Sequence, residues 1–143
     1  STAAPKIEQI IKENPSIQVV IDLHRDGVAE STRLVTEQNG KKMAQIMFFN
    51  GLSRTTSIGD IAYLKNPYIE DNLAFSFQMQ LAAAEYYPGL TRRIYLKGYR
   101  YNMHFCPKSL LVEVGAQTNT LKEAQNSMEP LAELLGKVLG GEE

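Results

Sequence analysis

Two continuous apolar runs constrain the fold of this chain more than any other feature. Residues 17–22 contain three successive β-branched side chains, and residues 110–114 are apolar at every position except Glu113. Continuous runs of this kind are typical of strands buried on both faces of a parallel sheet. Ile7, Ile10 and Ile11 share one helical face just before the first run, which predicts a helix–turn–strand step. We therefore expect an α/β fold: a mostly parallel twisted sheet with helices on both faces.

A β-hairpin is predicted between the two apolar runs. Asn39-Gly40 is the strongest short hairpin signal, because both residues tolerate positive φ. The arms are residues 32–37 and 42–49, and the second arm is apolar enough to enter the main sheet. Residues 51–69 show no clear period and predict a long surface loop.

Two further helices and one strand are expected towards the C-terminus. Residues 70–86 predict a helix with an apolar face, and residues 92–96 predict a strand. Thr120 and Glu123 form a capping-box pattern at the start of the last helix. Pro130 should kink that helix or split it in two. The expected apolar face of the helix over residues 70–86 consists of Leu73, Phe77, Leu81 and Ala84.

Length and composition exclude several classes of protein. The 143 residues suffice for one domain, the net charge of −1 gives no basic field for nucleic acid, and no run is apolar enough to span a membrane. The single cysteine, Cys106, excludes an intramolecular disulfide. The chain begins at Ser1 without a methionine, which indicates a processed or excised piece of a longer protein.

His24 is the first candidate for chemistry. It follows the first apolar run in a polar turn, His24-Arg25-Asp26-Gly27, at the carboxyl end of a strand, where open α/β sheets bind ligands. Such a histidine is either a structural loop residue or a metal ligand. Asp22 or Asp26 would then orient the imidazole, as a second carboxylate often does for a metal-bound histidine.

Glu113 is the second candidate. An ionised glutamate inside a buried strand is costly unless it is paired or bound to a metal. Two interpretations remain open: a salt bridge to one of the arginines, or a general acid or base whose pKa the apolar setting tunes.

His104 and Cys106 support weaker hypotheses. His104 is either a solvated loop residue, a third metal ligand or a substrate contact. Cys106 is interpreted as a small apolar side chain, since its two-residue separation from His104 does not favour a reactive pair.

Five motifs occur together in this order, and the set resembles the stage II sporulation protein P family, peptidoglycan hydrolases similar to zinc N-acetylmuramoyl-L-alanine amidases. The motifs are His24-Arg-Asp-Gly27 with the preceding strand from Asn14, Tyr87-Pro-Gly-Leu-Thr-Arg92, Tyr99-Arg-Tyr-Asn102, Leu110-Leu-Val-Glu-Val-Gly115 and Asn119-Thr-Leu-Lys-Glu123.

The resemblance implies a role for each candidate. His24 matches a zinc ligand and Glu113 matches the catalytic acid/base for cleavage of the bond between N-acetylmuramic acid and L-alanine. Arg25, Arg100, Asn102 and His104 are candidate substrate contacts. Endopeptidase activity is also implied, with no residue assigned to it.

The resemblance further implies that residues 1–143 are the C-terminal portion of one catalytic domain. The resemblance implies that the family's other zinc ligands, a histidine and a glutamate, come from a segment upstream of residue 1; Glu30 and His104 are candidate replacements here, although neither matches the family's pattern. We expect weak zinc binding, little activity for this chain alone, and self-association through an exposed sheet edge.

Implied partners are peptidoglycan and the sporulation proteins SpoIID and SpoIIM. The implied location is outside the cytoplasm, with the parent protein anchored at the septal or engulfing membrane of sporulating cells. A peptidoglycan- or partner-binding module without catalysis is the alternative function.

Overall fold

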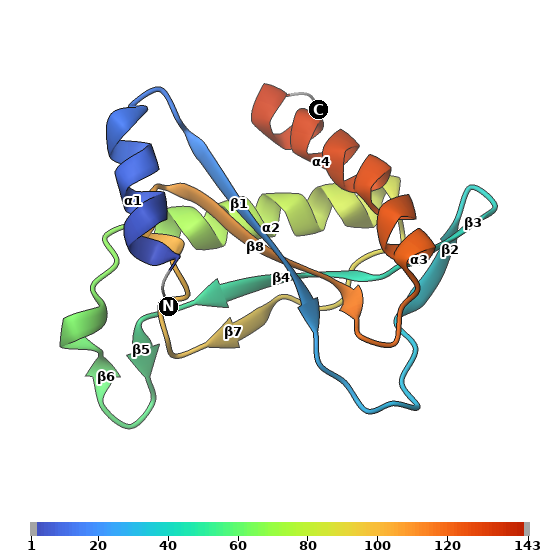
Figure 1. Ribbon diagram of the computed structural model, residues 1–143, viewed down its shortest axis with the longest axis horizontal. Coiled ribbons are helices and arrows are strands. Elements are labelled where there is room, and N and C mark those ends of the chain that lie inside the picture. Colours follow the sequence, from blue (N-terminus) through green and yellow to red (C-terminus); the bar gives the residue numbers. More distant parts are fainter. Residues whose placement is uncertain (1–2, 142–143) are drawn as a thin grey trace.

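The computed structural model describes residues 3–141; Ser1, the residue on which the processing hypothesis rests, lies outside the described part. It combines helices and strands, with a run of six strands after the first helix and two consecutive helices at the C-terminal end (Figure 1). The elements are α1 (Ala4–Glu13), β1 (Val19–Asp26), β2 (Val35–Gln38), β3 (Lys41–Ala44), β4 (Ile46–Gly51), β5 (Arg54–Thr55), β6 (Gly59–Asp60), η1 (Ala62–Leu64), α2 (Ile69–Tyr86), β7 (Tyr95–Lys97), η2 (Met103–Phe105), β8 (Lys108–Ala116), α3 (Leu121–Asn126) and α4 (Met128–Gly140).

Four strands form the main sheet in the order β1-β8-β4-β7. β1 pairs with β8 in parallel, β4 pairs with β7 in parallel, and only the central β8–β4 pairing is antiparallel. The prediction of a mostly parallel sheet is therefore confirmed. The second arm of the predicted hairpin continues as β4 and enters this sheet, as expected.

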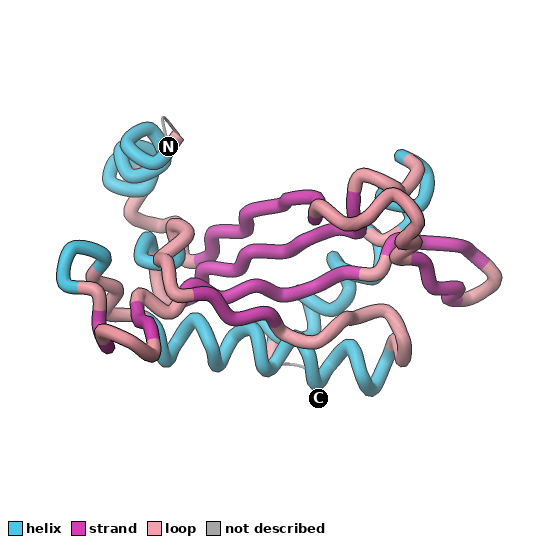
Figure 2. Tube along the Cα trace, turned by 90° about the horizontal axis from the view of Figure 1, so that it is seen from below, coloured by secondary structure: helices cyan, strands magenta, loops and turns pink. Residues whose placement is uncertain are grey.

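The main core lies between one face of the sheet and helices α2 and α4, which lie beneath it and contact each other (Figure 2). Ile46 and Phe48 of β4 and Val112 of β8 are fully buried on this face. Helix α1 lies above one end of the opposite face and has no buried residue of its own. Helices thus flank the sheet on both sides, but the second face stays largely open.

The predicted apolar face of α2 is wrong. Phe77 and Leu81 are 57% and 55% exposed, whereas Phe75, Met79 and Ala83 are buried against the sheet. The helix carries apolar side chains on more than one side, so its sequence period does not select a face. Packing against the sheet selects the stripe that contains Phe75, Met79 and Ala83.

Strand β1 is not the fully buried strand that its β-branched run predicts. It lies at the edge of the sheet and pairs only with β8. Leu23 is 53% exposed and Ile21 is 37% exposed. A continuous apolar run implies burial on both faces only when neighbouring strands and helices cover it, and at this edge they do not.

The local predictions are confirmed. Asn39 and Gly40 have φ values of 51° and 78°, as a tight β2–β3 hairpin requires. Thr120 and Glu123 form both hydrogen bonds of the capping box. The last helical pattern is split at Ser127, and Pro130 lies in the first turn of α4, where its missing N–H removes no helical hydrogen bond.

Candidate active site

His24 and Glu113 are direct neighbours on the open face of the sheet. They are paired residues in the parallel β1–β8 register, so their Cα atoms lie about one strand spacing, roughly 5 Å, apart. The sequence predicted a polar turn from His24 onwards, and that is incorrect: His24, Arg25 and Asp26 are residues of β1 itself. The β1–β8 pairing extends the strand, because tertiary pairing overrides the weak local preference of these polar residues.

Gly115 explains the end of the Leu-Leu-Val-Glu-Val-Gly motif. The β1–β8 register shifts between His24 and Asp26, and Gly115 in this irregularity has φ +58°. A Cβ atom there would lie 2.3 Å from Oδ1 of Asn119 and 2.8 Å from Cβ of Ala44. Only glycine fits this bulge, which lies two residues from Glu113.

Glu113 and His24 line a pocket of about 510 Å³ on the open face. This volume is within the range of small-ligand sites. Its floor comes from Met47 and Phe49 of β4 and Leu111 of β8. The remaining lining residues are Asp26, Gly27, Val28, Arg92, Tyr95, Lys97 and Tyr101.

Glu113 has no compensating partner in the described part of the chain. Among residues 3–141 it forms no ion pair within 4 Å, and its buried Oε2 atom has no hydrogen-bond partner. Burial, and next the charge of Asp26, raise the pKa of Glu113; His24 and Arg92 act in the opposite direction without cancelling this rise. The salt-bridge interpretation therefore does not describe this structure. An uncompensated carboxyl group with a raised pKa in a pocket is typical of a functional residue.

The two aspartates of β1 have different partners. Nε2 of His24 lies 2.9 Å from Oδ1 of Asp22, so Asp22 rather than Asp26 orients the imidazole. Asp26 instead accepts a hydrogen bond of 2.8 Å from Nη1 of Arg92. This pairing uses the arginine that would otherwise be available to neutralise Glu113.

The donor set does not complete a catalytic zinc site. Such a site normally has three protein ligands and a water. In the part of the chain that the structure describes, no three His, Cys, Asp or Glu side chains are arranged to hold a metal. His24 can supply one ligand, so a zinc ion bound here would need ligands from elsewhere.

The other candidate residues lie outside the pocket. Arg25 donates hydrogen bonds to the carbonyl oxygens of Ala116 and Asn119, and thereby joins β1 to the segment after β8. Arg100 donates to the carbonyl oxygen of Lys65, and Asn102 borders a smaller cavity beside α1.

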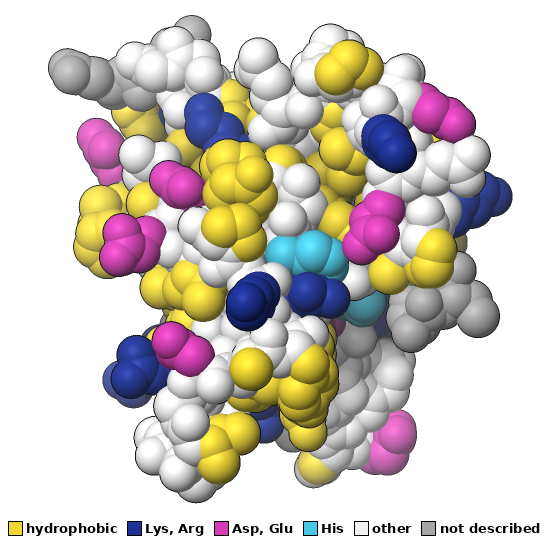
Figure 3. Space-filling model, turned by 90° about the vertical axis from the view of Figure 1, so that its left-hand side faces the viewer, with side chains coloured by type: hydrophobic (Ala, Val, Ile, Leu, Met, Phe, Trp, Pro, Cys, Tyr) yellow, Lys and Arg dark blue, Asp and Glu magenta, His cyan; other side chains and the backbone are white. Residues whose placement is uncertain are grey.

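His104 contacts Glu8 of α1 and does not lie beside His24 in the pocket. Its Nε2 lies 3.2 Å from Oε1 of Glu8, and burial lowers the pKa of His104 despite this contact. Figure 3 shows histidine and basic side chains next to one another, among apolar side chains, on the end of the molecule that carries α1. Neither His104 nor Glu30 lines the pocket of Glu113.

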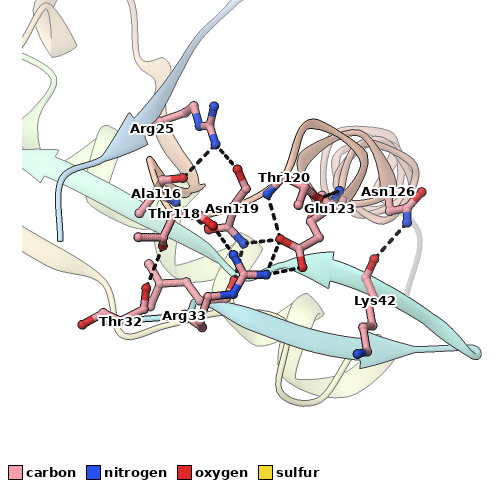
Figure 4. A network of polar contacts seen from close by, with 12 residues as sticks. Arg25, Thr32, Arg33, Lys42, Ala116, Thr118, Asn119, Thr120, Glu123 and Asn126 are labelled. Atoms are coloured by element: carbon pink, nitrogen blue, oxygen red, sulfur yellow. Dashed lines mark hydrogen bonds and ion pairs between the residues drawn. The ribbon is translucent and has the colours of Figure 1, made fainter. Parts of the chain in front are cut away.

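A polar network holds the segment after β8 in place (Figure 4). Asn119 accepts a hydrogen bond from the backbone N–H of Ala116 and donates to the carbonyl oxygen of Leu34. Arg33 donates to both carboxylate oxygens of Glu123 at 2.7 and 2.5 Å. Burial raises the pKa of Glu123, but the hydrogen bonds from Thr120 and Arg33 outweigh burial and keep it below its usual value.

Sequence reasoning did not assign a role to Arg92, Tyr95, Lys97 or Tyr101, which all line the pocket. Arg92 ends one motif of the family resemblance, and Tyr101 lies in another, which was the available signal. No sequence signal marked Tyr95 or Lys97 as a pocket residue, because only the parallel β4–β7 pairing brings them to the open face.

Comparisons with known proteins agree with the resemblance. The family model described as stage II sporulation protein P matches residues 1–136. Stage II sporulation protein P of Bacillus subtilis (strain 168) is 24% identical over 139 residues, which cover 94% of this chain and 31% of that protein. The chain thus spans about a third of the length of this relative. No solved structure matches significantly.

Proposed function

Since the chain belongs to the stage II sporulation protein P family and so has a role in sporulation, we propose that it forms the acid–base part of the catalytic site of a peptidoglycan amidase. The substrate is the amide bond between N-acetylmuramic acid and the first L-alanine of the stem peptide. One observation carries this proposal: Glu113 lies uncompensated in an open pocket, in register with His24.

Glu113 acts as the acid/base in this proposal. A water molecule attacks the amide carbonyl carbon, and the carboxylate of Glu113 accepts a proton from it. Glu113 then donates that proton to the leaving amine as the C–N bond breaks. The raised pKa moves the carboxyl group towards the working pH, where it can both accept and donate a proton. Such a role is typically worth a factor of about 10²–10⁴ in rate.

For zinc, we propose which residues would hold the ion. His24 would provide one ligand and, since no group of three suitable donors exists among the described residues, the others would come from protein outside them; a bound zinc ion would activate the attacking water and polarise the amide carbonyl. We therefore expect residues 1–143 alone to bind zinc weakly and to release little product. Metal analysis of this chain, beside a longer protein that contains it, tests this point; equimolar and tightly held zinc in the short chain would contradict it.

The activity test uses purified cell wall and the longer protein. Wild-type protein should release muropeptides, and Glu113→Gln should reduce release by a factor of about 10²–10⁴ while binding to cell wall persists. Asp60→Asn, a carboxylate substitution at a solvent-exposed position away from the pocket, is the matched control and should keep full activity. Full activity of Glu113→Gln would refute the assignment.

The same experiment separates the alternative function. A wild-type protein that binds cell wall but releases no product would favour a peptidoglycan- or partner-binding module. Family resemblance also motivates SpoIID and SpoIIM as partners and a site of action at the septal or engulfing membrane, and co-purification from sporulating cells tests both. No helix among the described residues is long and apolar enough to cross a membrane.

A further inference from the structure

Two charged side chains that line the pocket have no charged partner among the residues that the structure describes. Asp26 is paired with Arg92, and His24 lies against Asp22. Glu113 and Lys97 form no ion pair within 4 Å among residues 3–141. The proposed reaction uses Glu113, so Lys97 is the unused charge of this pocket.

An aromatic surface holds Lys97 at the pocket wall. Its Nζ atom lies 5.3 Å from the centre of the Tyr95 ring, a cation–π distance. The Tyr95 ring lies 5.4 Å from that of Phe49, and the Phe49 ring lies 4.7 Å from that of Tyr101. This side of the pocket therefore combines one positive charge with exposed ring surface, which suits an anionic group on a partly apolar chain.

The sheet register gives the separation of the two charges. Glu113 pairs with Met47 of β4, and Lys97 pairs with Gly51, four residues further along the same strand. Two strand spacings and four residues of rise place the Cα atoms of Glu113 and Lys97 about 16 Å apart. Since Nζ lies back over Tyr95, the charge itself is roughly 12–16 Å from Glu113, which is about four residues of extended peptide.

We propose that Lys97 binds a carboxylate of the substrate peptide, about four residues from the amide bond at Glu113. The inference rests on the proposed function for the identity of the peptide, and it deepens that function by making the site selective for stem peptides with free carboxylates. Lys97 acts as a binding and specificity residue, far from the reacting atoms. A single exposed lysine contributes modestly, so the selectivity is a small factor.

The test measures binding, with no cleavage required. Chain 1–143 labelled with ¹⁵N is titrated with a muramoyl-pentapeptide that has free carboxylates, and with the same compound fully amidated. Wild-type protein should bind the free acid roughly twofold to fivefold more tightly. Higher salt should reduce this difference, because exposed charges are screened.

Variants assign the difference to Lys97. Lys97→Met should bind both compounds equally, and Lys97→Arg should retain the preference for the free acid. Lys122→Met removes the same charge from α3, outside the pocket, and should behave as wild type. Chemical-shift changes should lie at Lys97, Tyr95 and Tyr101.

Three outcomes would overturn the inference: equal wild-type affinity for the two compounds, a preference that survives in Lys97→Met, or no binding of either compound. These outcomes are separate from the fate of the proposed function. If the longer protein proves inactive while Lys97 still selects the free acid, the amidase proposal fails and the carboxylate site stands. If Glu113→Gln abolishes cleavage while both compounds bind equally, the amidase proposal stands and the carboxylate site at Lys97 is refuted.

Discussion

Replacement of Gly115 by alanine should destabilise the protein by about 2–5 kcal/mol, from two separate sources. The first is backbone strain: φ at Gly115 is +58°, and a residue with a Cβ atom pays about 1–2 kcal/mol in this region. The second is steric. The new Cβ would lie 2.3 Å from Oδ1 of Asn119, so the Asn119 side chain must move away from Ala116.

The displacement of Asn119 has a cost of its own. This side chain is 5% exposed and bridges the backbone N–H of Ala116 and the carbonyl oxygen of Leu34. A buried backbone group that loses its partner costs about 1–3 kcal/mol. Ala44, which is fully buried 2.8 Å from the new Cβ, leaves no room for relief on the other side.

Urea unfolding followed by circular dichroism measures the effect, and a thermal scan should show a decrease in Tm of roughly 5–15 °C. Gly27→Ala is the matched control. A Cβ at Gly27 meets no atom within 4 Å and its φ is not in the left-handed region, so the change should be neutral or stabilising by up to about 1 kcal/mol. If the two alanine variants are equally stable, the explanation of the bulge is refuted.

Three further predictions concern the polar groups and the sheet edge. Glu113→Gln should stabilise the protein at pH 7.5 but hardly at pH 4. Because the native pKa of Glu113 is raised, wild-type stability falls as the pH rises from the unfolded pKa through the native pKa, and glutamine avoids this loss. Urea midpoints at the two pH values check this, and an equal effect at both would contradict it. Glu123→Gln should cost about 1.5–3 kcal/mol at pH 7, because the charged hydrogen bonds to Arg33 are lost. Since the native pKa of Glu123 is lowered, its stabilisation is complete above the unfolded pKa and is lost on acidification through the native pKa, so the two proteins should converge as the pH falls below that native pKa. Leu23→Lys should reduce self-association of the chain in sedimentation velocity, because it places a charge on the exposed edge strand β1; unchanged association would exclude this edge as the contact.

Much of the candidate site was predictable because strand neighbours determine it. The two apolar runs are adjacent parallel strands, and this places His24 beside Glu113. The raised pKa of Glu113 was one of two open interpretations. Whether Glu113 forms a salt bridge or stays uncompensated depended on Arg92. Its guanidinium pairs with Asp26, 66 residues away in the sequence, and no pattern in the sequence selects that partner.

Elements set by contacts within a few residues were determined by the sequence alone. The Asn39-Gly40 turn, the Thr120–Glu123 capping box and the split of the last helical pattern each depend on local backbone preferences, and each is present; the split falls at Ser127, with Pro130 in the first turn of α4. Tertiary structure alone decided which side of α2 faces the sheet, that β1 is an exposed edge, and that Tyr95 and Lys97 reach the pocket of Glu113. The physical reason is that burial and charge pairing depend on which distant elements lie alongside, and a chain with several apolar stripes and several arginines permits more than one arrangement until it packs.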